Sequence, residues 1–156
     1  MGISGKAFNP MLIARKQSCE LMSYKLSDRG DNNKGKLEGL KVLVIEDDIV
    51  NITVMKWLLA ETGVKNITFA NSANEALSHL QNHFDLIFLD ISLPDLNGIE
   101  LCKKIRTLPN LKDIPIIAVT SFDDDAKELC ISAGMNGFIK KPIDINFLKD
   151  VIDKLI

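Results

Sequence analysis

Residues 41–48 read KVLVIEDD, an uninterrupted apolar run that ends in three acidic residues. A strand that is buried on both faces has this continuous apolar pattern, whereas a half-exposed strand alternates apolar and polar residues. Residues 85–90, DLIFLD, and residues 115–120, PIIAVT, repeat the pattern, and each run closes on a polar residue. We therefore predict three central strands of a sheet that is covered on both sides.

A helix is predicted between the first two strands, from Val50 to Glu61. Apolar residues recur there at helical spacing, and Gly63 is suited to end the helix in a left-handed conformation. The predicted buried face consists of Val50, Val54, Trp57 and Leu58. Trp57 is accordingly expected to be a core or partly buried residue.

The rest of the chain continues the alternation of helix and strand. Ser72 and Glu75 have the spacing of a capping box, which predicts a second helix. Five strands alternating with five helices predict a doubly wound, flavodoxin-like (βα)5 parallel sheet, with strand order 2-1-3-4-5 and a ligand site beyond the carboxyl ends of the strands. The other predicted strands are 66–70 and 137–141, and the other predicted helices are 99–106, 124–133 and 144–156.

The chain changes character near residue 37. Residues 27–36 are polar and predict a linker. Residues 10–25 could form one helix with Asn9 as its cap and Pro10 at its first position. We therefore divide the chain into an N-terminal extension and linker, residues 1–36, and a domain at residues 37–156. The apolar residues expected on the N-terminal helix are Leu12, Ile13, Leu21 and Met22.

Composition limits the classes of function. The 156 residues include 19 Lys and Arg and 21 Asp and Glu, a net charge of -2, whereas a nucleic-acid-binding protein usually has a basic excess. The chain has three cysteines, Cys19, Cys102 and Cys130. This odd number and the wide spacing favour neither a disulfide framework nor a zinc site. The sequence lacks the run of roughly 18 apolar residues that a membrane helix needs. We expect a cytoplasmic protein with protein partners, and no direct contact with nucleic acid or membrane.

Polar residues close the predicted strands where a ligand site is expected. Glu46 and Asp47 follow the first strand, Asp90 closes the third, Thr120 closes the fourth, and Lys141 lies at the end of the fifth. Two carboxylates about 5 Å apart repel by roughly 3 kcal/mol at an effective dielectric constant near 20. Such a cluster must bind a cation, take up protons or be tolerated for function. A hard divalent ion such as Mg²⁺, which prefers oxygen ligands, fits the first of these.

The other groups at these strand ends suit phosphate chemistry. A Lys ammonium is a mobile positive charge that can pair with phosphate, and a Thr hydroxyl can donate a hydrogen bond to it. An Asp carboxylate can act as a nucleophile and form an aspartyl phosphate. Asp48 is more suited to capping the helix that follows the first strand.

The stretch from Leu40 to Ile156 resembles the receiver domain of bacterial two-component response regulators. The resemblance rests on VLVIEDD at 42–48, LDISLPDLNG at 89–98, VTS at 119–121, and the dipeptide Lys141-Pro142. It implies that Asp90 is the phosphoacceptor and that the Lys141–Pro142 peptide bond is cis. It also implies a Mg²⁺ cofactor, with Asp47 and Asp90 as direct ligands, Glu46 acting mainly through water, and the backbone carbonyl of Ser92 as a further ligand.

The same resemblance assigns three residues to the response. Lys141 would pair with the phosphoryl oxygens, and Thr120 would be the switch hydroxyl that turns toward them. Phe138 would be the switch aromatic, which swings inward as Thr120 moves. Glu46 stands where the family often has Asp, and Phe138 where it has Tyr, so Phe138 can pack but cannot donate a hydrogen bond.

The function expected from the resemblance is a signalling switch rather than an enzyme. A histidine kinase or a phosphotransfer protein would donate the phosphoryl group, and a downstream protein would read the change. The domain could be stand-alone or part of a hybrid sensor kinase. One alternative is a binding module that has lost phosphorylation. Another is an aspartate-nucleophile phosphatase, although such enzymes usually have Asp-x-Asp after the first strand.

Overall fold

A five-stranded sheet forms the centre of the protein, in a computed structural model that describes residues 34–121 and 125–156. The strand order is β2-β1-β3-β4-β5, and every neighbouring pair is parallel. This is the predicted topology and strand order. The predicted helix at residues 10–25 lies outside the described residues. The strands are β1 Lys41–Ile45, β2 Asn66–Ala70, β3 Leu86–Leu89, β4 Ile116–Thr120 and β5 Gly137–Lys140.

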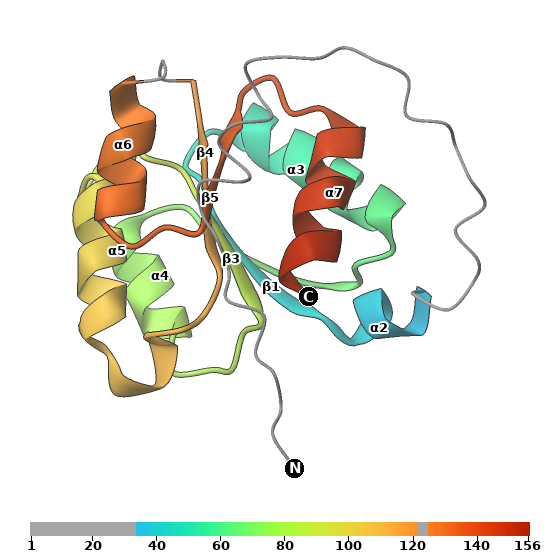
Figure 1. Cartoon of the computed structure of the whole chain (residues 1–156), viewed down its shortest axis with the longest axis horizontal. Coiled ribbons are helices and arrows are strands. Elements are labelled where there is room, and N and C mark those ends of the chain that lie inside the picture. The colour runs from blue at the N-terminus through green and yellow to red at the C-terminus, as the bar shows by residue number, and fades with distance from the viewer. Residues whose placement is uncertain (1–33, 122–124) are drawn as a thin grey trace.

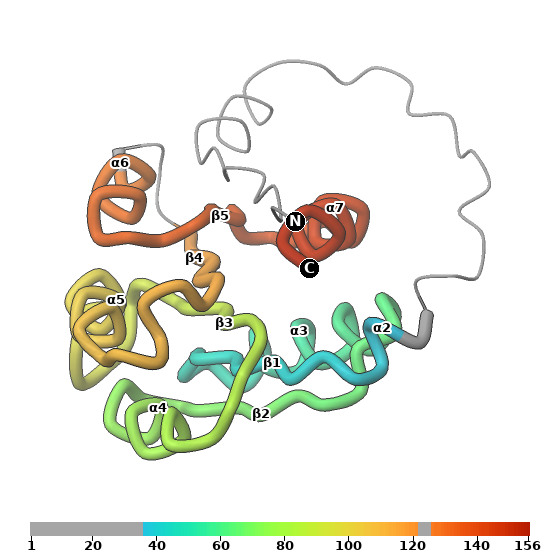
Figure 2. Tube along the Cα trace, turned by 60° about the horizontal axis from the view of Figure 1, so that its bottom comes forward, coloured from blue at the N-terminus to red at the C-terminus, as the bar shows by residue number. Residues whose placement is uncertain are grey.

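Helices cover both faces of this sheet, as predicted for a doubly wound fold. In Figure 1, α4, α5 and α6 lie on one side of the strands, and α3 and α7 lie on the other. Figure 2 shows the sheet between these two layers from another angle. The helices are α2 Lys34–Gly39, α3 Ile49–Thr62, α4 Ala73–His79, α5 Gly98–Thr107, the 3-10 helix η2 Pro109–Leu111, α6 Asp125–Ser132 and α7 Ile145–Leu155.

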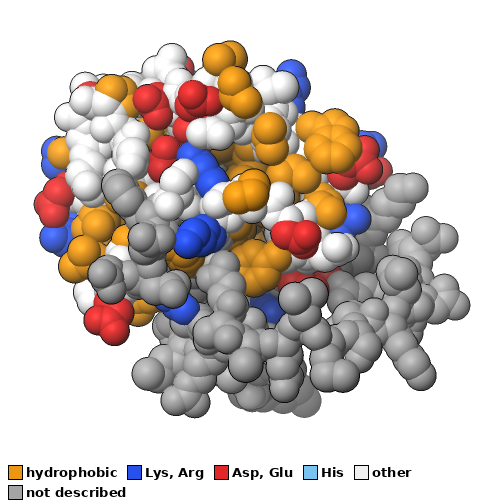
Figure 3. Space-filling model, turned by 90° about the horizontal axis from the view of Figure 1, so that it is seen from above, with side chains coloured by type: hydrophobic (Ala, Val, Ile, Leu, Met, Phe, Trp, Pro, Cys, Tyr) orange, Lys and Arg blue, Asp and Glu red, His pale blue; other side chains and the backbone are white. Residues whose placement is uncertain are grey.

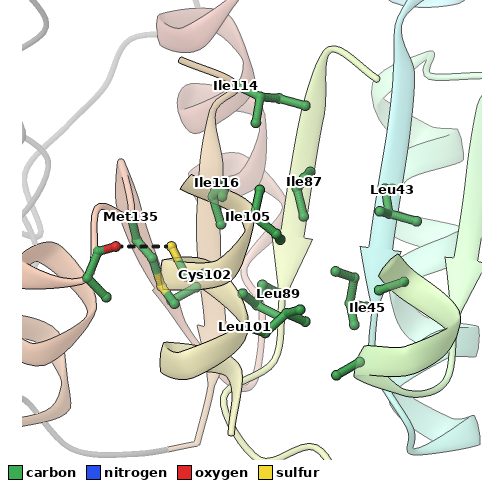
Figure 4. Packing of buried hydrophobic residues seen from close by; sticks show 14 of the residues in the cluster. Leu43, Ile45, Ile87, Leu89, Leu101, Cys102, Ile105, Ile114, Ile116 and Met135 are labelled. Atoms are coloured by element: carbon green, nitrogen blue, oxygen red, sulfur yellow. Dashed lines mark hydrogen bonds between the residues drawn. The ribbon is translucent and has the colours of Figure 1, made fainter. Parts of the chain in front are cut away.

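Each face of the sheet has its own hydrophobic core. Leu43 and Ile45 of β1 point toward the α4, α5 and α6 layer, whereas Val42 and Val44 point toward α3 and α7. Figure 4 shows side chains of β1 and β3 directed toward Leu101 and α5 on the first face. All four β1 residues named here are at most 2% exposed, which confirms the prediction that this strand is buried on both faces.

Two cysteines belong to the first core. Cys102 and Cys130 are free and buried, and the Cys102 thiol donates to the carbonyl of Ala133 at 3.4 Å (Figure 4). Burial raises the pKa of the Cys102 thiol, and it raises that of Cys130 to about 11. Both thiols are therefore protonated at neutral pH and pack as small apolar groups, as predicted. Cys19 lies outside the described residues.

The buried face of α3 differs from the prediction. The helix begins at Ile49, and of the four residues expected to be buried only Leu58 is, at 4% exposure. Val50, Val54 and Trp57 are 65%, 41% and 63% exposed. The expectation that Trp57 is a core or partly buried residue is wrong.

The physical reason is that α3 has apolar residues on more than one side. Met55, Leu58 and Leu59, at i, i+3 and i+4 spacing, pack on the sheet. The Asp48 carboxylate caps the helix by accepting from the backbone amides of Val50 and Asn51, at 2.8 and 2.9 Å. Because two apolar stripes have helical spacing, the spacing alone does not identify the one that faces the sheet.

A short helix, α2, occupies the start of the described chain. Its first residues, 34–36, fall within the stretch predicted to be a linker, whereas Leu37 is buried at 9% exposure. The Lys36 ammonium donates to the main-chain oxygen of Ile156 at 2.5 Å, which ties α2 to the end of α7. A domain boundary near residue 37 stays a prediction.

Arg106 of α5 links three segments at the amino ends of the strands. Its guanidinium donates to the carbonyls of Gly134, Leu111 and Ile114 and to the side chain of Asn136, at 2.7 to 3.0 Å. All five N–H donors of the side chain are used. Partial burial lowers the pKa of Arg106, but the guanidinium remains charged at neutral pH.

We expect Arg106→Lys to lower the free energy of unfolding by about 2–3 kcal/mol, because an ammonium has three donors and cannot reproduce the planar fork. Urea denaturation measures the loss. Lys103→Gln is the matched control on the same helix, since the exposed pair of Lys103 with Glu100 should contribute less than about 1 kcal/mol. Equal losses for the two variants would contradict this role of Arg106.

Candidate phosphoacceptor site

Three carboxylates gather at the carboxyl end of the sheet. Ile45 of β1 lies opposite Leu89 of β3, so the next residues, Glu46 and Asp90, emerge side by side. The backbone amide of Asp90 donates to the Ile45 carbonyl at 2.9 Å, which extends the hydrogen bonding between β1 and β3 by one bond. Carboxylate oxygens of Glu46, Asp47 and Asp90 lie within 4.8 Å of one another. Glu46 and Asp90 are 4% and 6% exposed, while Asp47 is exposed to solvent.

Lys141 supplies positive charge to the same site. Its Nζ atom lies 2.5 Å from Glu46 Oε2 and 3.3 Å from Asp90 Oδ2, although 95 residues separate it from Glu46. The backbone of Lys141 follows β5 directly, and its amide donates to the Thr120 carbonyl at 2.9 Å. The Lys141–Pro142 peptide bond is cis, as predicted. The structure therefore brings together the acids and the amine that the sequence placed at separate strand ends.

Hydrogen bonds orient the two buried carboxylates. Glu46 Oε1 accepts from the backbone amide of Asp48 and from the side-chain amide of Asn51, both at 3.2 Å. Asp90 Oδ1 accepts from the amide of Ser92 at 3.3 Å. These bonds leave each carboxylate with one oxygen toward Lys141 and fix the direction in which the cluster faces.

The chemistry of this donor set suits Mg²⁺. Three carboxylates and one ammonium leave a formal charge of -2 among the four side chains. A divalent cation would balance that charge, and Mg²⁺ commonly uses one or two carboxylates together with water. The exposure of Asp47 leaves the cluster open to solvent on that side. The residues present therefore fit a magnesium ion.

The remaining predicted residues surround the carboxylates. Thr120 is the last residue of β4 and is 1% exposed. Phe138 of β5 lies beside Ala118 in the sheet and is 3% exposed, packed in the core on the α4, α5 and α6 side. Ser92 is exposed and contacts Asp90 through its backbone amide. Their roles as switch residues and as a carbonyl ligand stay predictions.

A pocket of about 150 Å³ opens beside these side chains. Glu46, Asp90 and Lys141 form part of its wall, together with Asn51 of α3. Figure 3 views this end of the molecule and shows acidic side chains next to a basic one, with hydrophobic side chains close by. The apolar part of the wall was not predicted from the sequence. It includes Val54, Met55, Phe88, Val119 and Ile143.

Asp95 positions the loop that follows Asp90, a role that was not predicted from the sequence. Its carboxylate accepts from the amides of Ala73 and Asn74, both at 2.9 Å, at the start of α4. These backbone hydrogen bonds hold the pKa of Asp95 below its usual value. Because the partners are 21 and 22 residues away, no local spacing in the sequence could have identified the contact.

The family model of the response regulator receiver domain matches residues 42–153. The chain belongs to this family. Receiver domains are signalling switches that take phosphate from histidine kinases or phosphotransfer proteins. No helix in residues 34–121 or 125–156 has the length and apolar character needed to cross a bilayer.

Relatives of this receiver domain include parts of much longer histidine kinases. It is 34% identical over 133 residues to the osmosensing histidine protein kinase SLN1 of Saccharomyces cerevisiae, an alignment that covers 78% of the chain. It is 33% identical over 115 residues to the signal transduction histidine-protein kinase BarA of Escherichia coli, covering 72% of the chain. The alignments span only 10% and 12% of those two proteins.

Solved structures of receiver domains have the same fold. The receiver domain of the sensor histidine kinase PA1611 from Pseudomonas aeruginosa, solved with a magnesium ion in its active-site cleft, is 31% identical with a TM-score of 0.69. That match covers 75% of this chain and 97% of the other. A putative response regulator from Chloroflexus aurantiacus is 29% identical with a TM-score of 0.70, covering 74% and 96% of the two chains.

Proposed function

We propose that this receiver domain accepts a phosphoryl group on Asp90 in a Mg²⁺-dependent reaction and then signals through protein contacts. One observation carries the proposal: the Asp90 carboxylate lies 3.3 Å from the Lys141 ammonium and shares a 4.8 Å cluster with Glu46 and Asp47. A buried nucleophile, a cation and a metal-binding acid pair are the groups that phosphoryl transfer to a carboxylate requires.

In the proposed reaction, a carboxylate oxygen of Asp90 forms a bond to the phosphorus of a phosphohistidine. The P–N bond breaks, and its electron pair returns to the imidazole of the donor. Lys141, which already contacts Asp90 Oδ2, would stabilise the charge on the phosphoryl oxygens. Bound Mg²⁺, held by Asp47, Asp90, the Ser92 carbonyl and, through water, Glu46, would offset the charge of the transferring group.

The response to phosphorylation would begin at Thr120. The phosphoryl group adds a charge of about -1.5 to -2, and the Thr120 hydroxyl can donate to it. Phe138 is buried here, so the structure describes an inward position, and the proposed switch requires a second, outward position of the ring. The face formed by α6, β5 and α7 adjoins both residues and is the proposed output surface.

The proposed partners are proteins on both sides of the reaction. A histidine kinase or phosphotransfer protein would be the donor, and a downstream protein would bind the output surface, without direct contact to nucleic acid or membrane. The proposed compartment is the cytoplasm. The small formal charge of -2 supports protein partners over nucleic acid.

Incubation with acetyl phosphate and Mg²⁺ tests the proposal. We expect the intact mass of the wild-type protein to increase by one phosphoryl group and that of Asp90→Asn to stay unchanged. Asp48→Asn is the matched control, because asparagine keeps the cap of α3 and the residue lies outside the acid cluster. If the wild type gained no mass, or Asp90→Asn gained as much, the domain would be a binding module without phosphorylation.

A further inference from the structure

One side of α3 exposes a row of apolar side chains. Val50, Val54 and Trp57 are 65%, 41% and 63% exposed, and their spacing of four and three residues places them on one face of the helix. Ile49, 71% exposed, extends the row at the amino end. A contiguous apolar surface of this kind on a folded domain usually marks a binding surface. We call these four residues the α3 face.

Acidic residues flank the α3 face at both ends. Asp48, the cap of the helix, and Asp47 before it are exposed at the amino end, and Glu61 is exposed near the carboxyl end. Lys56 is the single basic residue of α3. The face therefore suits a partner that combines apolar side chains with positive charge.

Residues 10–25 have this composition. If they are helical, as the sequence predicts, Leu12, Arg15, Cys19 and Met22 share one side, because they are separated by three, four and three residues. The segment contains Arg15, Lys16 and Lys25 but only one acid, Glu20, for a net charge of +2. Arg15 and Lys16 lie near the middle of the segment, and Lys25 lies at its carboxyl end.

The chain enters the domain beside the carboxyl end of α3. A Cβ atom built on Gly63, the cap of α3, would lie 4.0 Å from the Cβ of Leu37 in α2. The backbone carbonyl of Glu38 accepts a hydrogen bond from the Asn66 side chain at 2.8 Å. The Glu38 carboxylate forms an ion pair with Lys65 at 2.9 Å. The start of the described chain is thus fixed close to the end of α3, and α2 is seen below that end in Figure 1.

The connection is long enough for the segment to lie along α3. Residues 26–33 can span at most about 27 Å, and the 14 residues of α3 extend about 21 Å. A helix whose carboxyl end lies at this point and which runs back along α3 is parallel to α3. Lys25 would then lie near Glu61, and Arg15 and Lys16 would lie toward Asp48.

We propose that residues 10–25 dock as a helix on the α3 face, parallel to α3. Leu12, Cys19 and Met22 would cover Val50, Val54 and Trp57. The tether favours this occupant over a second copy or a separate protein, because a short linker gives an effective concentration in the millimolar range. The proposal does not depend on phosphorylation of Asp90.

Fluorescence of the full chain tests the proposal, since Trp57 is its only tryptophan and lies on the α3 face. The probe is acrylamide quenching, compared between the wild type and the double variant Leu12→Asp, Met22→Asp. Because a tethered segment with a millimolar effective concentration docks even when its intrinsic affinity is modest, we expect the quenching constant to rise about twofold or more in the variant. A red shift of the emission should accompany it.

Ile13→Asp is the matched control, because it makes the same chemical change one residue away, on a different side of the predicted helix. It should leave the quenching constant near the wild-type value. Glu61→Lys should raise the constant, and adding Lys25→Glu should lower it again. Circular dichroism melts would show that these variants keep the fold of the domain.

Three results would overturn the proposal. The wild type and the double variant could have equal quenching constants, which would mean that the segment does not cover Trp57. Ile13→Asp could release Trp57 as fully as the double variant, which would exclude the assigned side. Protection could also increase with protein concentration, which would show that a second copy covers the α3 face instead.

Discussion

Replacing Gly98 with alanine is expected to lower the free energy of unfolding by about 3 kcal/mol or more. Gly98 is buried at the start of α5, and a Cβ atom there would lie 2.3 Å from the Asp90 carbonyl oxygen and 2.8 Å from the Ile91 Cα. Both atoms are backbone, so no side-chain rotation can relieve the overlap. The Gly98 amide also donates to the Ile91 carbonyl at 2.9 Å, which holds the two segments together.

Because the overlap falls on Asp90 itself, Gly98→Ala should also slow phosphorylation of the fraction that remains folded. Urea denaturation measures the first effect, and the initial rate of mass gain with acetyl phosphate measures the second. Gly39→Ala is the matched control, since a Cβ there would meet nothing within 4 Å. A Gly98→Ala protein as stable as Gly39→Ala would show that the loop after β3 is not packed as described.

Lys141→Ala is expected to slow phosphorylation of Asp90 by about 10²- to 10³-fold, because it removes an ammonium that contacts the phosphoacceptor. Affinity for Mg²⁺ should be retained or should increase. Lys141 pairs with Glu46 at 2.5 Å, so it competes with a metal ion for the negative charge of the acids. The opposite directions of the two effects distinguish a catalytic loss from general damage to the site.

The rate of mass gain with acetyl phosphate at saturating Mg²⁺ measures the first effect, and calorimetric titration with Mg²⁺ measures the second. Lys140→Ala, an exposed lysine one residue earlier, is the matched control and should change neither quantity appreciably. If Lys141→Ala were phosphorylated at the wild-type rate, the proposed role of its ammonium would be wrong.

The fold could be predicted because its main determinants are local. The apolar runs ending at Ile45, Leu89 and Thr120 identify buried parallel strands, and the strands pair in the predicted order. The meeting of Glu46, Asp90 and Lys141 follows from that order, because parallel strands carry their closing residues to one edge of the sheet. The strand order alone was therefore enough to predict that these three side chains, distant in the sequence, lie close together.

Other features depend on contacts that the sequence does not encode locally. Trp57 is exposed because α3 has two apolar stripes, and packing on the sheet selects the one that contains Met55. The bonds of Arg106 to the segment 134–136 and of Asp95 to α4 join residues 21 to 30 positions apart. Their side chains are common surface types, so nothing in their spacing distinguishes them from solvated residues.

The Mg²⁺ dependence of Asp90 phosphorylation tests most directly whether the acids at two strand ends form one metal-dependent phosphoacceptor site. The quantity to measure is the Mg²⁺ concentration that gives half the maximal rate with acetyl phosphate, in the wild type, Asp47→Asn and Asp48→Asn. We predict that Asp47→Asn raises it at least about tenfold, whereas Asp48→Asn leaves it nearly unchanged. An Asp47→Asn protein with the wild-type Mg²⁺ requirement would contradict the proposed site.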